Sequence, residues 1–142
     1  DQGKQSFQCS RRLDALKVWV ALQRYGAAGI GTIYESLCAT ARALYEAVRA
    51  RDGFEALHEP ESNILCFRWV GEGSLDPARL DARNLCAREE LNRSGEGWIT
   101  TTVLDGRRVL RVTVMNPRTT EVDLARVLDG LEARASAGEE GA

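Results

Sequence analysis

The sequence predicts an α+β fold in which an antiparallel sheet carries helices on one of its faces. The first observation is a pair of β-type runs joined by Leu104-Asp105-Gly106-Arg107, because Asp-Gly between such runs is a strong hairpin signal. The second is an alternating apolar run over 63–70, which indicates another strand. The third is helical spacing of apolar residues on both sides of these strands. Antiparallel strand pairs with helices over one face make an α+β sandwich.

Length and composition predict a globular domain. The chain has 142 residues, of which 44% are hydrophobic and 28% charged, so it can bury a core and is not disordered. Its net charge is −2 and its arginines are spread among as many acids, which argues against a nucleic-acid partner. No apolar run is long enough to span a membrane, and no charged-then-apolar leader opens the chain. We therefore expect no membrane partner.

The four cysteines indicate a reducing compartment. They are widely spaced and form no C-x-x-C pair, and His58 is the only histidine, so a metal site is not expected. Sparse cysteines among apolar neighbours are typical of small core residues in reduced proteins. The predicted location is the cytoplasm. The cysteines are Cys9, Cys38, Cys66 and Cys86.

The first predicted helix is unusually apolar. It follows a polar lead-in over 1–9, is capped by Ser10, and runs to about Tyr25 with Gly26 as its stop. Apolar residues occupy almost every side of it, so it must be covered on more than one side. One interpretation is that another domain or subunit packs there; the other is an ordinary central helix.

The remaining elements are predicted from the glycine, proline and capping residues that bound them. We expect a flexible stretch over 26–31 and a polar tail that frays beyond Arg134. Asp76-Pro77 opens a helix with proline at its first position. The predicted order is a long helix to about Arg51, strands over 54–58 and 63–70, a helix over 77–93, the hairpin, and a helix capped by Thr119 or Thr120 after Asn116-Pro117 ends the last strand.

Arg111 is the strongest candidate for a functional residue. In the second hairpin strand, Leu110 and Val112 point one way, whereas Arg111 and Thr113 point the other. A guanidinium in mid-strand, opposite the aliphatic stripe, is placed to bind a carboxylate through two hydrogen bonds. The threonines over 100–102 can supply hydroxyl groups on the paired strand. The alternatives are that this face is simply hydrated, or that Arg111 pairs with an acid there.

Other motifs carry little chemistry. The glycines over 26–31 follow a helix rather than a strand, which excludes a dinucleotide or Walker phosphate loop. His58 beside Glu59 is a conceivable general base, but a solvated loop histidine is the better interpretation. Lys17 has apolar neighbours that can lower its pKa, yet a helix lysine extending to solvent explains it better.

Several segments of the chain resemble, in the same order, the pyridoxal-phosphate-dependent group II decarboxylases. That family includes the glutamate, aromatic amino acid and 2,4-diaminobutyrate decarboxylases. The resemblance covers nearly the whole chain, from about Ser6 to Leu131. The segments are 8–19 (QCSRRLDALKVW), 54–55 (FE), 63–68 (NILCFR), 109–111 (VLR) and 116–121 (NPRTTE).

The resemblance implies the fold of the aspartate aminotransferases, which have a large cofactor-binding α/β domain and a small C-terminal α+β domain. Residues 1–26 would then be the end of the large domain and an interface helix, 27–134 the small domain, and 135–142 a polar tail. The apolar first helix fits this division, because the large domain and a partner subunit would cover it.

The resemblance also implies site residues. Arg111 matches an active-site arginine associated with the substrate carboxylate. Ser10 and Arg11 match a segment near the dimer interface, close to the neighbouring subunit's cofactor, although many relatives have glycine in place of Ser10. The family's Schiff-base lysine follows a histidine, and neither Lys4 nor Lys17 does. We therefore expect no catalytic residue in this chain and no pyridoxal phosphate held by it alone.

The resulting hypothesis is a C-terminal fragment of an amino acid decarboxylase that is inactive by itself. It would contribute Arg111 to recognition of an amino acid substrate and its first helix to packing against the large domain and a homodimer partner. The alternative is a free-standing, non-catalytic α+β module for interaction or ligand binding.

Overall fold

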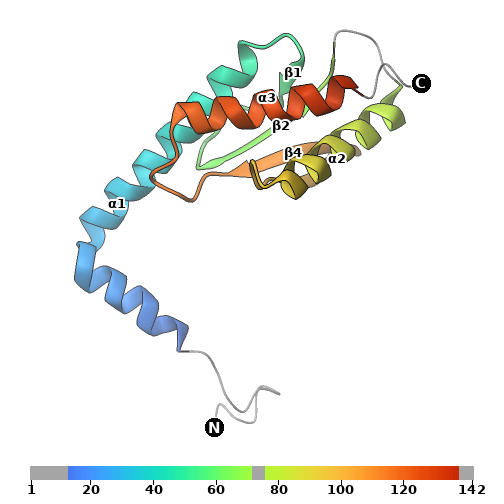
Figure 1. Ribbon diagram of the computed structural model, residues 1–142. Helices are drawn as coiled ribbons and strands as arrows, with labels where there is room; N and C mark the ends of the chain where they lie inside the picture. Colours follow the sequence, from blue (N-terminus) through green and yellow to red (C-terminus); the bar gives the residue numbers. More distant parts are fainter. Residues whose placement is uncertain (1–12, 72–75, 138–142) are drawn as a thin grey trace, which may run out of the picture. The chain divides into compact units, whose positions relative to one another are not determined.

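The computed structural model describes residues 13–71 and 76–137 and confirms the α+β prediction. Helices and strands alternate in nearly the predicted order (Figure 1). The elements are α1 (Asp14–Arg49), β1 (Phe54–Ala56), β2 (Ile64–Trp69), α2 (Pro77–Ser94), β3 (Thr100–Leu104), β4 (Arg107–Thr113) and α3 (Glu121–Ala137).

The chain divides into two compact units, 1–33 and 34–142, and α1 contributes to both. Gly26 has φ 67° and ψ 173°, a conformation that glycine adopts readily, so the predicted helix end is a break at this residue. The prediction of a flexible stretch over 26–31 is wrong, because residues 27–31 are helical. Ala27 and Ala28 favour helix strongly enough to offset the nearby glycines.

The described strands form one four-stranded antiparallel sheet in the order β1-β2-β4-β3. β3 and β4 make the predicted hairpin, and Leu104 pairs with Arg107 across its turn. Asp105 and Gly106 have φ values of 51° and 76°, as a type I′ turn requires at both central positions. The hairpin therefore fixes which residues of β4 face each side of the sheet.

One face of the sheet is covered by helices. In Figure 1, α2 and α3 lie side by side in front of the strands, and the two helices pack against each other. Burying a leucine or phenylalanine side chain contributes about 1.5–3 kcal/mol, so each large side chain buried in this core stabilises the fold by that order. The core side chains come from β2 and β4 (Leu65, Phe67, Trp69, Leu110), α1 (Leu44, Val48), α2 (Ala87, Leu91) and α3 (Leu124, Leu128, Leu131, Ala135).

The two later helices begin with side-chain caps. Asp76 accepts hydrogen bonds from the N–H groups of Ala78 and Arg79, and Pro77 is the first residue of α2. At α3, Thr120 and Asp123 exchange main-chain and side-chain hydrogen bonds, as in a capping box. Residues 135–137, which were predicted to fray, are helical, because α3 continues to Ala137.

The buried side of Ala135 explains this longer helix. Its side chain is fully buried in the core, and its carbonyl accepts a hydrogen bond from Arg83 Nη1 at 2.8 Å. Residues 138–142 of the predicted tail lie outside the described residues. In the described part of the chain, no helix is both long and apolar enough to cross a bilayer.

Candidate functional site

Arg111 lies in the middle of β4, on the face of the sheet that points away from the helical layer. Its direct cross-strand neighbours are Cys66 in β2 and Thr100 in β3. Leu110 and Val112, on either side of it, point into or against the core. The side chain of Arg111 is exposed, as the alternation predicted. We call this side of the sheet, which also carries Thr102, the open face.

Glu55 in β1 and Asp81 in α2 are engaged by other arginines. Glu55 pairs with Arg107 at 3.8 Å, and Asp81 pairs with Arg68 at 2.5 Å. Within 13–71 and 76–137, Arg111 forms no ion pair, so the alternative of a neighbouring acid finds no support there. Its guanidinium is therefore exposed on the sheet without an acidic partner among the described residues.

Only two of the three predicted threonines share the open face with Arg111. Thr100 and Thr102 pair with Arg111 and Val109, and alternate residues of a strand share a face. Thr101 points to the opposite side, where its hydroxyl oxygen accepts a hydrogen bond from Arg108 Nη1 at 3.4 Å. The Thr100 hydroxyl donates to the carbonyl of Arg111 at 3.1 Å. Thr100 therefore holds the main chain of Arg111 and does not offer its proton to a ligand.

Cys66 adds a buried thiol next to Arg111. Only 6% of the residue is exposed, and burial raises the pKa of the thiol, while the positive charge of Arg111 lowers it. The net shift is upward, so the thiol stays neutral near pH 7. A neutral buried thiol is a packing group rather than a nucleophile.

His58 is anchored to the sheet, which the interpretation as a solvated loop histidine did not foresee. Its ring nitrogen Nε2 accepts a hydrogen bond from the N–H of Cys66 at 3.1 Å, and Nδ1 lies 3.0 Å from the carbonyl oxygen of Glu59. These partners assign the proton to Nδ1 and leave the Nε2 lone pair occupied. His58 is exposed, but its basic nitrogen is not available to abstract a proton.

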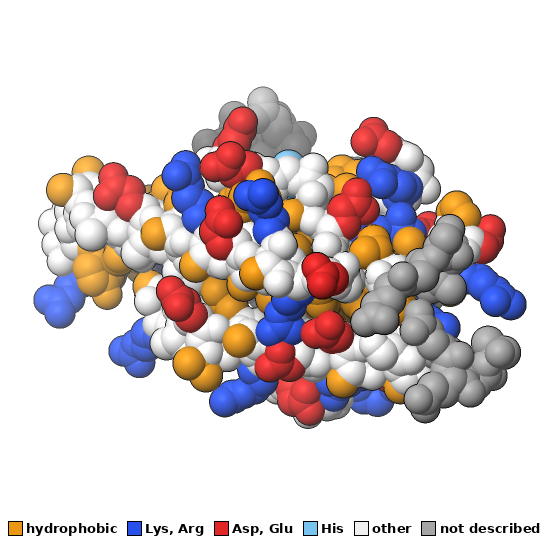
Figure 2. All heavy atoms as spheres, turned by 90° about the horizontal axis from the view of Figure 1, so that it is seen from above, with side chains coloured by type: hydrophobic (Ala, Val, Ile, Leu, Met, Phe, Trp, Pro, Cys, Tyr) orange, Lys and Arg blue, Asp and Glu red, His pale blue; other side chains and the backbone are white. Residues whose placement is uncertain are grey.

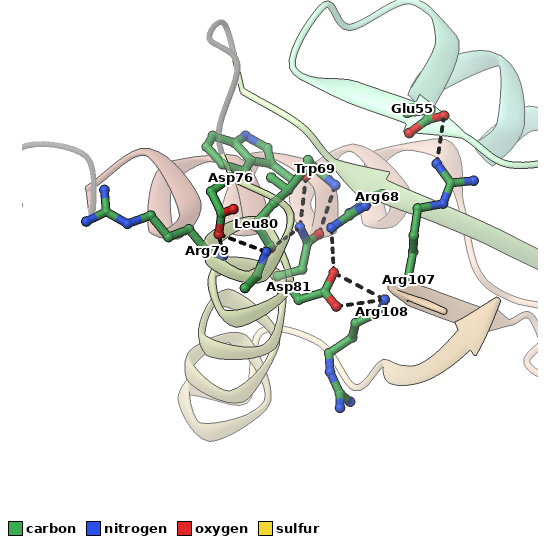
Figure 3. A network of polar contacts seen from close by, with 11 residues as sticks. Glu55, Arg68, Trp69, Asp76, Arg79, Leu80, Asp81, Arg107 and Arg108 are labelled. Carbon is green, nitrogen blue, oxygen red and sulfur yellow. Dashed lines mark hydrogen bonds and ion pairs between the residues drawn. The ribbon is translucent and has the colours of Figure 1, made fainter. Parts of the chain in front are cut away.

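Sequence reasoning missed a pair of polar side chains that α2 inserts at the edge of β2 (Figure 3). Asn84, which is fully buried, accepts from Trp69 N at 2.9 Å and donates to Trp69 O at 2.8 Å. Asp81, one turn earlier on α2, accepts from Arg108 N, with both carboxylate oxygens at 3.2 Å. We call Asp81 and Asn84 the α2 wedge. The available signal was their spacing of three residues, which places them on one side of a helix.

Comparison with known proteins identifies the family. The model of the pyridoxal-dependent decarboxylase conserved domain matches residues 1–70. L-2,4-diaminobutyrate decarboxylase of Rhizobium meliloti (strain 1021) is 32% identical over 90% of this chain and 26% of its own length. The acidic amino acid decarboxylase GADL1 of Bos taurus is 30% identical over 93% of this chain and 27% of its own length. The chain belongs to the pyridoxal-dependent decarboxylase family.

Solved structures of the family share this fold. The glutamate decarboxylase domain of a Vibrio parahaemolyticus protein superposes with a TM-score of 0.78 at 31% identity, covering 89% of this chain and 27% of that one. Mouse CSAD superposes with a TM-score of 0.80 at 29% identity, covering 95% and 30%. The chain thus spans less than a third of the length of the family members it matches.

The described residues do not by themselves fit the family's pyridoxal phosphate. Lys17 lies on an exposed helix, where its Nζ pairs with Asp14 Oδ1 at 2.8 Å. His58, the single histidine, is bound to Cys66, as described above. Between 13 and 71 and between 76 and 137, no cluster of His, Cys, Asp and Glu suits a metal ion either. Among the described residues, Lys17 and His58 are therefore engaged by partners within this chain.

Two predicted family residues cannot be placed. Ser10 and Arg11, matched to a segment near the neighbouring subunit's cofactor, lie outside the described residues, and Lys4 does too. Their roles remain predictions from the resemblance.

The helix that follows them is exposed and apolar, as its sequence indicated. Trp19 is 58% exposed and Val18 is 61% exposed in the described structure. A shallow apolar pocket lies on this helix between Leu16 and Tyr25. The other exposed apolar residues of this stretch are Leu13, Val20 and Leu22.

Proposed function

We propose that this chain is the C-terminal portion of a pyridoxal-phosphate-dependent amino acid decarboxylase, and that Arg111 binds the substrate carboxylate. The observation that carries the proposal is the position of Arg111: an exposed guanidinium in mid-strand that forms no ion pair within the described residues, while Asp81 and Glu55 are paired to Arg68 and Arg107. A guanidinium presents a planar fork of donors that matches the two oxygens of a carboxylate. Bound pyridoxal phosphate would supply the electron sink for loss of CO₂.

The geometry defines what this chain contributes to that reaction. β4 is paired on both edges near Arg111, and Thr100 fixes the main chain of Arg111 by a hydrogen bond. A strand paired on both edges fixes the main chain of Arg111, so the side chain leaves the sheet at a defined point on the open face, and the remaining entropy cost of binding is that of ordering the side chain. The amino acid that is decarboxylated would be selected largely by residues of the large domain.

We further propose that the helix containing Trp19 packs against the large domain and a homodimer partner. Its apolar surface is exposed in the described structure, and the relatives that this chain matches are several times longer. Ser10 and Arg11 would lie near the partner's cofactor, as the resemblance implies. The cytoplasm is the proposed location, since Cys38, Cys66 and Cys86 are all free thiols and reduced cysteines are typical there.

The test of the carboxylate role is Arg111→Lys in the complete enzyme. Lysine keeps the charge but loses the bidentate fork, so turnover should fall on the order of a hundredfold while cofactor absorbance stays nearly intact. Arg107→Lys is the matched control, because Arg107 lies on the same strand and face but is paired with Glu55. It should leave turnover within about twofold of the wild type. Unchanged kinetics for Arg111→Lys would refute the assignment.

A separate experiment tests whether this chain binds pyridoxal phosphate without the large domain. We expect the purified chain, mixed with pyridoxal phosphate and reduced with borohydride, to give no stoichiometric lysine adduct on peptide mapping. Lys17 is paired with Asp14 on an exposed helix that offers the cofactor no enclosing site. A stoichiometric adduct at Lys17 would show that this chain holds its own cofactor and that the proposed division is wrong.

A further inference from the structure

The sheet opens at the end where α2 lies, and this opening bears on Arg111. β2 and β4 pair from Ile64–Thr113 to Phe67–Leu110. If the ladder continued, Trp69 would lie opposite Arg108. Instead, Asn84 takes the main-chain groups of Trp69, and Asp81 takes the N–H of Arg108. The α2 wedge therefore replaces the missing rung with two side chains from a helix.

Asp81 is the member of the wedge that contacts β4. Between Arg107 and Val109, β4 is paired with β3 along one edge. Along its other edge, Arg108 N donates to both oxygens of the Asp81 carboxylate. Arg111 follows three residues later on the same strand.

The register of β4 decides where Arg111 points. Because side chains alternate along a strand, a shift by one residue would turn Arg111 into the core and bring Leu110 or Val112 to the open face. A smaller twist of the strand end would displace the guanidinium without unfolding the sheet. A displacement of about 1 Å can cost on the order of a hundredfold in rate at a site that depends on orientation.

We propose that Asp81 is a positioning residue for Arg111: by accepting from the N–H of Arg108 where the pairing of β4 with β2 ends, it fixes the twist of this end of β4 and so the position of the guanidinium on the open face. Asp81 can hold a charge in this place because its carboxylate also pairs with Arg68, of which only 3% is exposed. One carboxylate thereby joins α2, β2 and β4. The inference rests on the proposed function, since it assumes that Arg111 binds the carboxylate.

The test is a double-mutant cycle in the complete enzyme with Asp81→Asn, Arg111→Gln and both together. The substrate is whichever of L-2,4-diaminobutyrate, cysteine sulfinate and L-tryptophan the enzyme decarboxylates. The corresponding amine, which lacks the carboxylate, serves as a competitive ligand. We expect Asp81→Asn to raise KM about tenfold through misplacement of Arg111, and to leave the inhibition constant of the amine unchanged. In the Arg111→Gln background, Asp81→Asn should not raise KM further.

Asn84→Ala is the matched control. Asn84 belongs to the same wedge but binds only β2 and its own helix, through Trp69 and Leu80. We expect this variant to lower the melting temperature while leaving the ratio of substrate to amine affinity as in the wild type. If Asp81→Asn does not fold, Asp81→Asn with Arg68→Gln removes both charges of the buried pair and is scored in the same way.

The outcomes separate the two proposals. If Arg111→Gln leaves KM unchanged, the proposed function fails. If Arg111→Gln raises KM but Asp81→Asn does not, only the positioning role fails. The positioning role is also overturned if Asp81→Asn weakens binding of the amine as much as it raises KM for the substrate. It is overturned as well if Asp81→Asn raises KM by the same factor in the Arg111→Gln background as in the wild type. Both results would indicate a general loss of structure.

Discussion

The two faces of the sheet have different compositions and different purposes. The covered face places Leu65, Phe67 and Leu110 under the helices with 1% exposure or less. The open face presents the charge of Arg111 between Thr100 and Cys66. On the side of the molecule drawn in Figure 2, acidic and basic side chains are interspersed, so this side has no field of one sign. The contrast teaches that the helix-covered side buries the main core, whereas the other side buries Val109 and Cys66 and leaves Arg111 exposed.

Removing a side chain from the covered face should have the largest effect on stability. Phe67 is fully buried and contacts the ring of Phe54, with 6.0 Å between ring centroids. Phe67→Ala should lower the free energy of unfolding by about 3–5 kcal/mol, as measured by urea denaturation. On the open face, Thr102→Ala should change it by about 0.5 kcal/mol or less. Similar losses for both variants would remove the distinction between the faces.

A second contrast lies within α1, between its buried and exposed apolar residues. Leu44 and Val48 are 1% exposed or less, whereas Leu16 and Trp19 are about half exposed. Replacing Leu16 and Trp19 by glutamine should reduce self-association of the isolated chain, because less apolar surface is available for contact. Sedimentation velocity measures this, and the melting temperature of the core should not change. If the variant still self-associates, the contact surface lies elsewhere on the chain, and the exposed residues Trp98 and Met115 are the next candidates.

A smaller effect would test whether Arg111 and Cys66 are neighbours in solution. Burial raises the pKa of the Cys66 thiol, and the Arg111 charge lowers it. Arg111→Gln should therefore raise the pKa further, reduce the thiolate fraction at any given pH, and slow alkylation by iodoacetamide. The measurement is the pH dependence of the alkylation rate, with mass spectrometry to distinguish Cys66 from Cys86. The difference in alkylation rate between the wild type and Arg111→Gln should vanish in urea. A lower Cys66 pKa in the variant would contradict the placement of Arg111 beside Cys66.

Local patterns were sufficient to predict the elements near Arg111. Asp105-Gly106 specified the turn, alternation specified the faces of β4, and Asn116-Pro117 ended the strand as expected. The α2 wedge could not be predicted, because it depends on the separation of β2 from β4 and on their packing against a helix. The same limit applied to Thr101, whose face depends on the register of β3 against β4.

A crystal structure of the complete enzyme with pyridoxal phosphate and a carboxylated substrate analogue would test the central claim most directly. We expect the guanidinium of Arg111 to donate two parallel hydrogen bonds of about 2.8 Å to the analogue's carboxylate, with the open face turned toward the cofactor. Asp81 should still accept from the N–H of Arg108 in that complex. A carboxylate held by other residues, with Arg111 facing water or a protein acid, would contradict the account.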